Sequence, residues 1–252
     1  FLFFALTAPH SPIAPTSRWS GTSGAGSYGD FVSEMDWALG VVLDALARND
    51  LERDTLVVFT SDNGSPQYDG TGHEGAIGSV KERFGHDPSR PWRGLKGDVW
   101  EGGHRVPFVV RWPGRVPAGT SSATPLVLTD LYRTTLAMAG GEPELGEAED
   151  SFDFSTAWRG TAPSRPAHEI LIHHSSRGLF AIRVGSWKLV DGRGSGGFTP
   201  DDGEPDAAEG QLFDLARDPG ETTNLWSAEP RIVEDLLDRL RRIVASAATT
   251  RS

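Results

Sequence analysis

The 252-residue sequence contains no cysteine. Disulfide bridges, zinc sites built from thiolates and cysteine nucleophiles are therefore excluded from this chain. The sequence also has no apolar run close to the roughly 18 residues of a membrane-spanning helix, so we expect no membrane span. Its first residues, FLFFALT, lack methionine and a positively charged start, which is unlike a signal peptide. They are more typical of a buried strand, and we expect the chain to be a piece of a longer protein.

Positive charge is in the minority. The chain has 24 Lys and Arg against 35 Asp and Glu, a net charge of -11 at pH 7. Proteins that bind nucleic acids carry a basic patch that neutralises phosphates, so we expect no nucleic-acid partner. The hydrophobic share of 37% is that of an ordinary globular protein, with enough residues for one large domain, or for one domain and a smaller one.

The hydrophobic pattern of the first part of the chain predicts an α/β arrangement. Residues 1–7 and 56–60 are short apolar runs typical of buried strands, and between them apolar side chains recur every three or four positions over 28–46. Strand, helix and strand in this order favour a right-handed parallel crossover. A third strand at 106–112 and a helix ending near 139 follow.

A different pattern begins after residue 150. Short apolar segments alternate with turn residues, which predicts antiparallel strands, and the chain ends in an amphipathic helix. We therefore expect two domains. Residues 1–150 form an α/β domain with a mostly parallel sheet flanked by helices, and residues 151–252 form a small α+β subdomain with an antiparallel sheet and a terminal helix.

Polar residues with useful chemistry follow the ends of the expected strands, where ligands gather in open α/β sheets. Asp62 and Asn63 offer a carboxylate and an amide oxygen, which suit Ca²⁺ or Mg²⁺, although Asp-Asn-Gly is also a common turn. His10 lies on a proline-rich loop and can donate to an oxyanion or a leaving group. Lys96 lies between two glycines and offers a point charge to an anion. These residues form one candidate site.

The order of four stretches resembles the sulfatase family. They are APHSP at 8–12, DTLVVFTSDNG at 54–64, RGLKGDVWEGGHRVPFVVRWPG at 93–114, and the tail segments LFDL and DPGETTNL at 212–215 and 218–225. The resemblance covers nearly the whole chain. It implies an alkaline-phosphatase-like fold, the hydrolysis of sulfate esters, Ca²⁺ and a formylglycine nucleophile.

The resemblance also implies roles for individual residues. Asp62 and Asn63 match metal ligands, and Lys96 matches the lysine that contacts the sulfate. His10 matches the histidine that contacts the sulfate or the leaving-group oxygen. His104 is a further candidate for substrate contact, although positioning the next strand is an equal alternative. The implied substrate is a sulfated small molecule or glycan, and the family suggests a periplasmic or secreted location.

One part of the family pattern is missing. In sulfatases a (Cys/Ser)-x-Pro-x-Arg motif and a pair of aspartates precede the Ala-Pro-His segment, and this chain has neither. HDPSR at 86–90 and TAPSR at 161–165 mimic only the motif's tail. We therefore expect a C-terminal portion of a sulfatase, with an incomplete Ca²⁺ site, the formylglycine upstream, and no activity by itself. A phosphate mono- or diester hydrolase of the same superfamily and a non-catalytic module that binds sulfated glycans remain alternatives.

Some residues have simpler interpretations. We expect Glu101 and Arg105 to pair with each other or with the backbone. His173 and His174 are adjacent in an expected strand, so their side chains point to opposite faces and cannot easily share one metal ion. His73, in the long polar segment after Gly64, is expected to be a solvated loop histidine.

Overall fold

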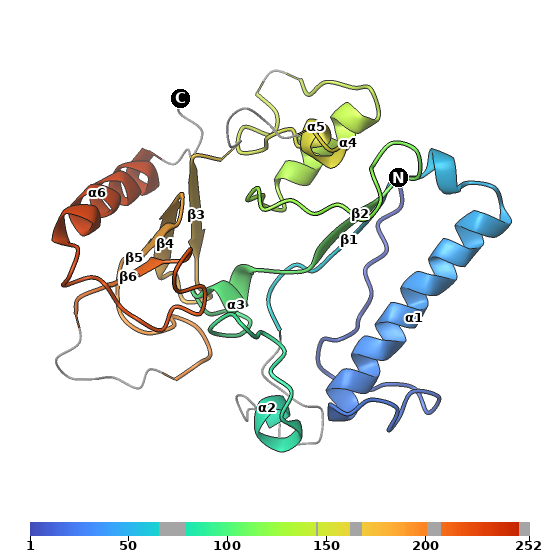
Figure 1. The fold of residues 1–252 in the computed structure, drawn as a ribbon, viewed down its shortest axis with the longest axis horizontal. Coiled ribbons are helices and arrows are strands. Elements are labelled where there is room, and N and C mark those ends of the chain that lie inside the picture. The colour runs from blue at the N-terminus through green and yellow to red at the C-terminus, as the bar shows by residue number, and fades with distance from the viewer. Residues whose placement is uncertain (66–78, 145, 162–167, 201–207, 247–252) are drawn as a thin grey trace.

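The structure is a computed structural model that describes residues 1–65, 79–144, 146–161, 168–200 and 208–246. Its described part contains two sheets with helices around them (Figure 1). The strands are β1 (Val57–Thr60), β2 (Phe108–Arg111), β3 (Ile170–His174), β4 (Phe180–Val184), β5 (Trp187–Val190) and β6 (Gln211–Asp214). The helices are α1 (Gly26–Arg48), α2 (Ser79–Phe84), α3 (Glu101–His104), α4 (Asp130–Met138), α5 (Ser155–Trp158) and α6 (Pro230–Ser246), with a 3₁₀ turn η1 (Glu52–Asp54).

The α/β class, the C-terminal antiparallel sheet and the terminal helix are confirmed. The expected parallel crossover is not formed. Residues 1–7 belong to no strand, and β1 pairs with β2 in the antiparallel direction, with Val57 opposite Arg111. A strand needs a partner for its backbone groups, and an apolar strand needs cover for its faces. Within the described segments residues 1–7 have neither: they pair with no strand, and Phe1 and Phe3 are almost fully exposed.

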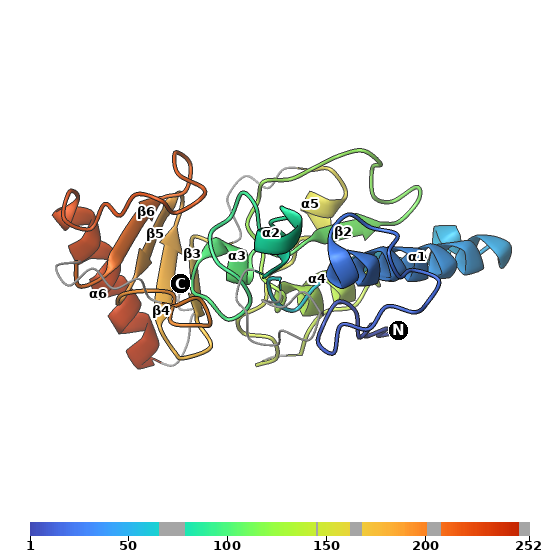
Figure 2. The ribbon, with the colours of Figure 1, turned by 90° about the horizontal axis from the view of Figure 1, so that it is seen from below.

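Helix α1 is amphipathic, as the sequence predicts, but only its first turns are well covered. Tyr28 and Phe31 pack with Ile13 and with Val80 of α2. Farther along α1, large apolar side chains such as Trp37 remain exposed. In Figure 2 the helix accordingly extends away from the rest of the molecule.

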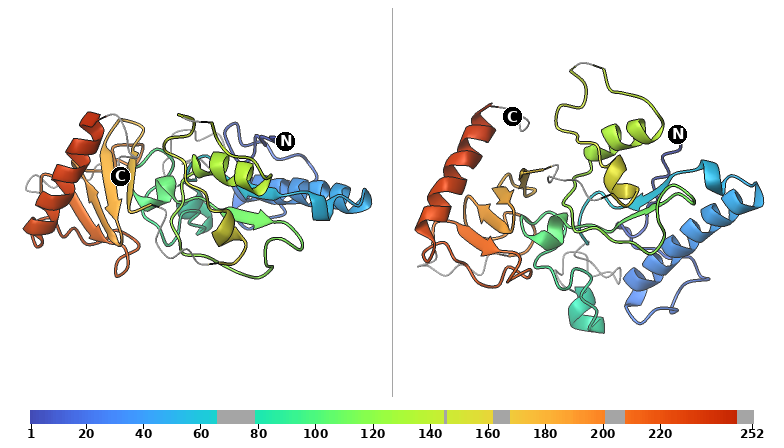
Figure 3. Two further views of the ribbon diagram at one scale, coloured as in Figure 1. Left: turned by 90° about the horizontal axis from the view of Figure 1, so that it is seen from above. Right: turned by 45° about the horizontal axis from the view of Figure 1, so that its top comes forward.

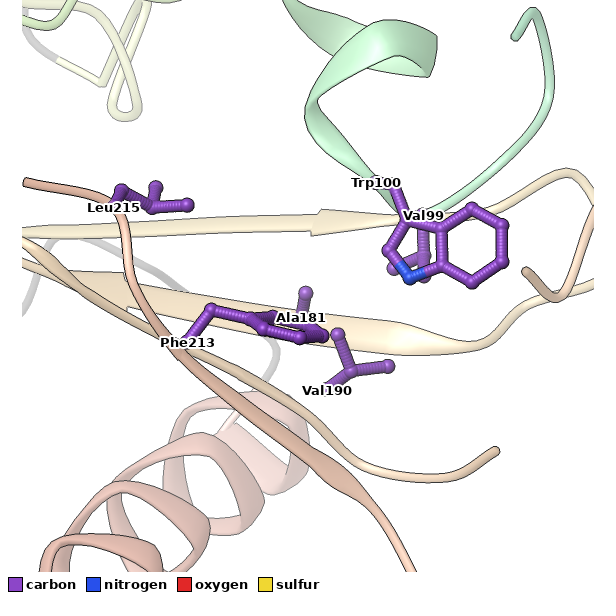
Figure 4. Close-up of a cluster of buried hydrophobic side chains, with 6 residues drawn as sticks. All are labelled: Val99, Trp100, Ala181, Val190, Phe213 and Leu215. Carbon is purple, nitrogen blue, oxygen red and sulfur yellow. The ribbon is translucent and has the colours of Figure 1, made fainter. Parts of the chain in front are cut away.

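The sheet β3–β4–β5–β6 is covered on both faces. Every neighbouring pair is antiparallel, which confirms the predicted hairpins. Helix α6 lies along one face (Figure 3), where the packed side chains are Ile182, Leu189, Leu212, Val233, Leu236 and Leu240. The other face packs on the segment that leads into α3 (Figure 4), through Val99, Trp100, Ala181, Val190, Phe213 and Leu215.

The short helix α3 lies between the two sheets in both Figure 1 and Figure 2. The segment after residue 150 is also tied back to the first part of the chain, because the N–H of Phe154 donates to Oγ1 of Thr134 at 3.0 Å. The domain boundary at 150 stays a prediction. No helix in the described segments is both long and apolar enough to cross a membrane.

Candidate active site

The loop after β1 carries Asp62 and Asn63. The hydroxyl of Ser61 donates to the carbonyl oxygen of Asn63 at 3.1 Å, so the Asp-Asn-Gly segment is a turn, as its sequence indicates. Asp62 is exposed and Asn63 is half-buried. The N–H of Gly64 then donates to the carbonyl oxygen of Gly103 in α3, at 2.9 Å. The turn therefore fixes the position of Asp62 and Asn63 against α3.

Glycine makes this contact possible. A Cβ atom built on Gly64 would lie 1.9 Å from the carbonyl oxygen of Gly102, far inside van der Waals contact. Gly102 and Gly103 in turn leave no room for a Cβ, since one on either would lie 2.2 Å from the carbonyl oxygen of Gly94 or Asp98. Three chain segments thus meet backbone to backbone.

Lys96 belongs to the third of these segments. Its flanking residues Gly94 and Gly97 have positive φ angles of 87° and 85°, a conformation that favours glycine. The N–H of Lys96 donates to the carbonyl oxygen of Ser65 at 2.7 Å. This bond places the backbone of Lys96, which is half-buried, beside the segment that carries Asp62 and Asn63. The structure brings these three predicted residues together.

His104 ends α3 and packs against His173 of β3, with ring centroids 4.2 Å apart. Nε2 of His173 lies 3.0 Å from the carbonyl oxygen of Val99, so we assign the ring proton to Nε2. Desolvation of the ring, which packs on His173, and then the charge of Lys188 lower the pKa of His104 to about 4, although the residue as a whole is exposed. The same two causes lower the pKa of His173 well below its ordinary value. Both rings are neutral near pH 7.

His10 lies on an exposed loop. Its Nδ1 atom is 2.6 Å from the carbonyl oxygen of Ser11, and no hydrogen bond within the described segments joins its ring to Asp62 or Lys96. The loop is tied to the site indirectly. Ala8 packs on the cluster that contains Tyr28, whose hydroxyl lies 3.1 Å from Oγ of Ser65.

Two of the expected metal ligands, Asp62 and Asn63, thus have side chains of the right chemistry. Asp62 and Asn63 offer the oxygen donors that Ca²⁺ prefers, but two residues fall short of the six or more oxygens of its shell. Across the described ranges no group of three or more His, Asp or Glu side chains is placed to hold a metal ion. The donor chemistry fits Ca²⁺, and these residues would form only part of its site.

Sequence reasoning missed a buried charge cluster under α3. Lys188 of β5 is fully buried, with Nζ at 3.1 Å from Oε1 of Glu101 and 2.8 Å from Oε1 of Glu221. Oε2 of Glu221 also accepts from the N–H of Glu101 at 2.7 Å. Because side chains alternate along a strand, Lys188 faces α3 while Leu189 faces α6. A lysine inside a strand that is covered on both faces was the signal available in the sequence.

The carboxylates of this cluster titrate differently. Burial works to raise the pKa of Glu101, but the charges of Lys188, Arg183 and Arg105 outweigh it, so the pKa is lowered. Burial prevails for Glu221 and raises its pKa. The expected pairing of Glu101 with Arg105 is confirmed at 3.4 Å.

The other sequence predictions concern the histidine pair His173 and His174, the loop residue His73 and the TAPSR segment. His174 is exposed while Nε2 of His173 lies 3.0 Å from the carbonyl oxygen of Val99, so the two side chains point apart, as the alternation along a strand predicts. His73 and residues 162–165 of the TAPSR segment lie outside the described residues.

Known proteins that are similar to this chain in sequence or in fold include sulfatases. A family model described as Sulfatase matches residues 1–141. Human arylsulfatase D is 34% identical over the whole chain, which covers 44% of that protein. Mouse steryl-sulfatase is 37% identical over 96% of the chain, which covers 40% of it. A solved sulfatase structure from Bacteroides thetaiotaomicron, described with the metabolism of multiple glycosaminoglycans, has a TM-score of 0.78 and 27% identity over 94% of this chain and 48% of its own. The chain thus spans less than half the length of these proteins.

Proposed function

Because this chain belongs to the sulfatase family, we propose that the whole protein hydrolyses sulfate esters and that this chain supplies part of its metal and sulfate site. One observation carries the proposal for the site. The backbone bonds from Lys96 to Ser65 and from Gly64 to Gly103 hold Lys96 beside Asp62 and Asn63. This backbone arrangement supports the proposal, because a sulfate group bound to a metal ion requires a cationic side chain near the oxygen ligands of the ion.

The proposal gives Lys96, Asp62 and Asn63 separate roles. Lys96 offers its ammonium group to the sulfate oxygens, where negative charge builds up during hydrolysis. Asp62 and Asn63 hold Ca²⁺ together with ligands from outside this chain, and the ion when bound withdraws charge from the sulfate. The nucleophile is a formylglycine in sequence outside these 252 residues, so this chain alone is inactive.

The two histidines contribute hydrogen bonds. His104 is neutral at pH 7, since its pKa is lowered to about 4, and it can position a substrate hydroxyl or sulfate oxygen without adding charge. His10 lies on an exposed loop, and its role in the proposal is to donate a hydrogen bond to the leaving-group oxygen.

The substrate is a sulfated small molecule or a sulfated glycan. The similar proteins include an arylsulfatase, a steryl-sulfatase and a sulfatase linked to glycosaminoglycan metabolism, which together span both classes.

The test uses the whole protein with 4-nitrophenyl sulfate and 4-nitrophenyl phosphate. We expect turnover of the sulfate and a loss of about a hundredfold or more in kcat/KM for Lys96→Ala, since a charge aimed at the developing oxyanion is removed. Lys81→Ala is the matched control, because Lys81 is 66% exposed and its partner among the described residues is Asp87. Preferred turnover of the phosphate would support the phosphate-ester alternative. Binding of sulfated glycans with no turnover of either ester would support a non-catalytic module.

A further inference from the structure

A pocket lies beside the Lys96 loop and has no assigned role. Its volume is about 380 Å³, within the roughly 300–1,000 Å³ of ligand pockets, and it is lined by Arg177 and by residues 193–200. Residues 193–200 belong to a glycine-rich segment between β5 and β6. The pocket is therefore built by the C-terminal part of the chain.

Close backbone contacts join this pocket to the candidate active site. The N–H of Ser176 donates to the carbonyl oxygen of Gly97 at 2.8 Å. A Cβ on Gly197 would lie 2.3 Å from the same oxygen, and the ring of Phe198 lies over Gly97. Since Gly97 directly follows Lys96, the pocket and the Lys96 loop share a wall.

The lining of the pocket is positively charged. Arg177 and Arg193 are both exposed, and the lining residues include no carboxylate. Nε of Arg193 donates to the carbonyl oxygen of Ala208 at 3.0 Å, which orients its side chain. The guanidinium group of Arg177 has no hydrogen-bond or ion-pair partner in the described segments of the chain. Within the described residues, the guanidinium group of Arg177 is therefore available to bind an oxyanion.

Among the described residues, Asp98 is a carboxylate beside the pocket, and backbone donors already engage its charge. Asp98 is fully buried, and its oxygens accept from the N–H groups of Leu95, Phe198 and Thr199 at 2.9–3.0 Å. Asp98 therefore holds Phe198 and Thr199 in place, and its oxygens are already satisfied. Phe198 keeps 40% of its surface exposed, which leaves an apolar face of the kind that packs against a sugar ring.

We infer that the Arg177 pocket binds a second anionic group of the substrate, a sulfate or a carboxylate on the sugar next to the one whose sulfate ester lies at Lys96. The inference rests on the proposed function. It names the substrate class as an oligosaccharide with anionic groups on adjacent sugars, rather than a lone aryl or steryl sulfate.

The experiment compares three substrates with the whole protein. They are a disaccharide with one sulfate on each ring, a disaccharide with one sulfate and one uronic carboxylate, and a disaccharide with a single sulfate. We expect Arg177→Ala to lower the ratio of kcat/KM for a dianionic substrate to that for the monosulfate by about ten- to a hundredfold, as expected for a lost charge-assisted hydrogen bond. Arg177→Lys restores part of the ratio. The substrate whose ratio falls identifies the second anion as sulfate or carboxylate.

Matched controls separate this effect from general electrostatics. Arg217→Ala and Arg241→Ala also remove exposed cations from the C-terminal part, but neither residue lines the pocket. Both are expected to keep the wild-type ratio. An unchanged ratio in Arg177→Ala as well would overturn the inference. It would mean that the guanidinium group of Arg177 does not contact the second anion.

Binding without turnover distinguishes this inference from the proposed function. Calorimetry with the disulfated disaccharide measures the pocket even if no ester is cleaved. Affinity that falls with Arg177→Ala in a protein that hydrolyses no sulfate would support the pocket and overturn the function. If sulfate is turned over, and Arg177→Ala changes neither the affinity nor the ratio, the function is supported and the role of the pocket is overturned.

Discussion

The two parts of the molecule are held together in different ways. In the C-terminal part, apolar side chains pack on both faces of the sheet β3–β6, and even the lysine at position 188 is fully buried. In the first part, large apolar side chains remain exposed on residues 1–4 and along α1. The candidate site loops meet there through glycine backbone contacts. The candidate site thus lies in the part with the less complete core.

This difference assigns a supporting role to the C-terminal part. Helix α3 belongs to both regions, because its glycines touch the Asp62 turn while Glu101, at its start, is bonded to Lys188 and Glu221. The packed sheet therefore provides a rigid base for loops that have little core of their own. Substitutions under the sheet should then change mainly the stability, and substitutions in the loops should change mainly the activity.

The largest expected effect is a loss of stability when the buried Lys188 cluster is broken. Lys188→Met keeps most of the side-chain volume but leaves Glu101 and Glu221 without their buried cation. We expect a loss of about 3–5 kcal/mol in the free energy of unfolding, measured by denaturant titration at pH 8. The loss should be smaller at pH 5, because the carboxyl groups then take up protons and shed their charge.

Lys81→Met is the control for Lys188→Met. Its ion pair with Asp87 is 2.9 Å long, but Lys81 is 66% exposed, so we expect a change within about 1 kcal/mol. Equal effects of the two substitutions would show that the buried cluster contributes no more than a surface pair. The comparison between the two regions would then fail.

The second prediction concerns the loops. Gly64→Ala places a Cβ where the carbonyl oxygen of Gly102 now lies, so the Asp62 turn must move relative to Lys96. A displacement of about 1 Å at a catalytic site can cost about a hundredfold, and we expect that loss in kcat/KM of the whole protein with 4-nitrophenyl sulfate. Stability should change less than in Lys188→Met.

Gly24→Ala provides the comparison for Gly64→Ala. A Cβ on Gly24 would meet nothing within 4 Å, so activity should stay at the wild-type level. Wild-type activity in Gly64→Ala would show that the backbone contact with α3 does not set the geometry of the site.

Local pattern in the sequence predicts much of this molecule. The turn at Asp62 and Asn63, the glycines beside Lys96 and the terminal helix are all encoded by neighbouring residues. Local pattern does not predict contacts between residues that are distant in the sequence. Nothing near Lys188 in the sequence indicates that Glu221 lies beside it, and the glycine-rich segment 193–200 has no periodicity that would place it against Gly97.

The expected parallel strand at residues 1–7 failed for the same reason. An apolar run predicts burial, but the strand forms only where another segment offers it a pairing edge and cover. The described residues offer neither, so Phe1 and Phe3 remain exposed. The roles of His10, Asp62 and Lys96 in catalysis stay predictions, since the structure fixes where they lie and not what they do.

The third prediction is a pH dependence at the boundary between the two regions. His104 has a pKa of about 4 in the folded chain and near 6.5 when unfolded, so the unfolded chain binds more protons between these values. The free energy of unfolding should therefore fall as pH is lowered from 6.5 to 4, by at most about 1.4 kcal/mol per pH unit for one proton, and by less because His104 is partly exposed. His104→Gln should flatten this slope without abolishing it, because His173 shifts in the same direction. An unchanged slope would show that His104 is solvated.

The smallest expected effect tests the exposed helix. Gly40 lies inside α1, and a Cβ there would meet nothing within 4 Å. Gly40→Ala should stabilise this chain by about 0.5–1 kcal/mol, since alanine loses less conformational entropy in a helix. The same substitution in the whole protein is the sharper measurement. If it stabilises this chain but destabilises the whole protein, another segment must pack on α1 beside Trp37, and the incomplete core of the first part is completed there.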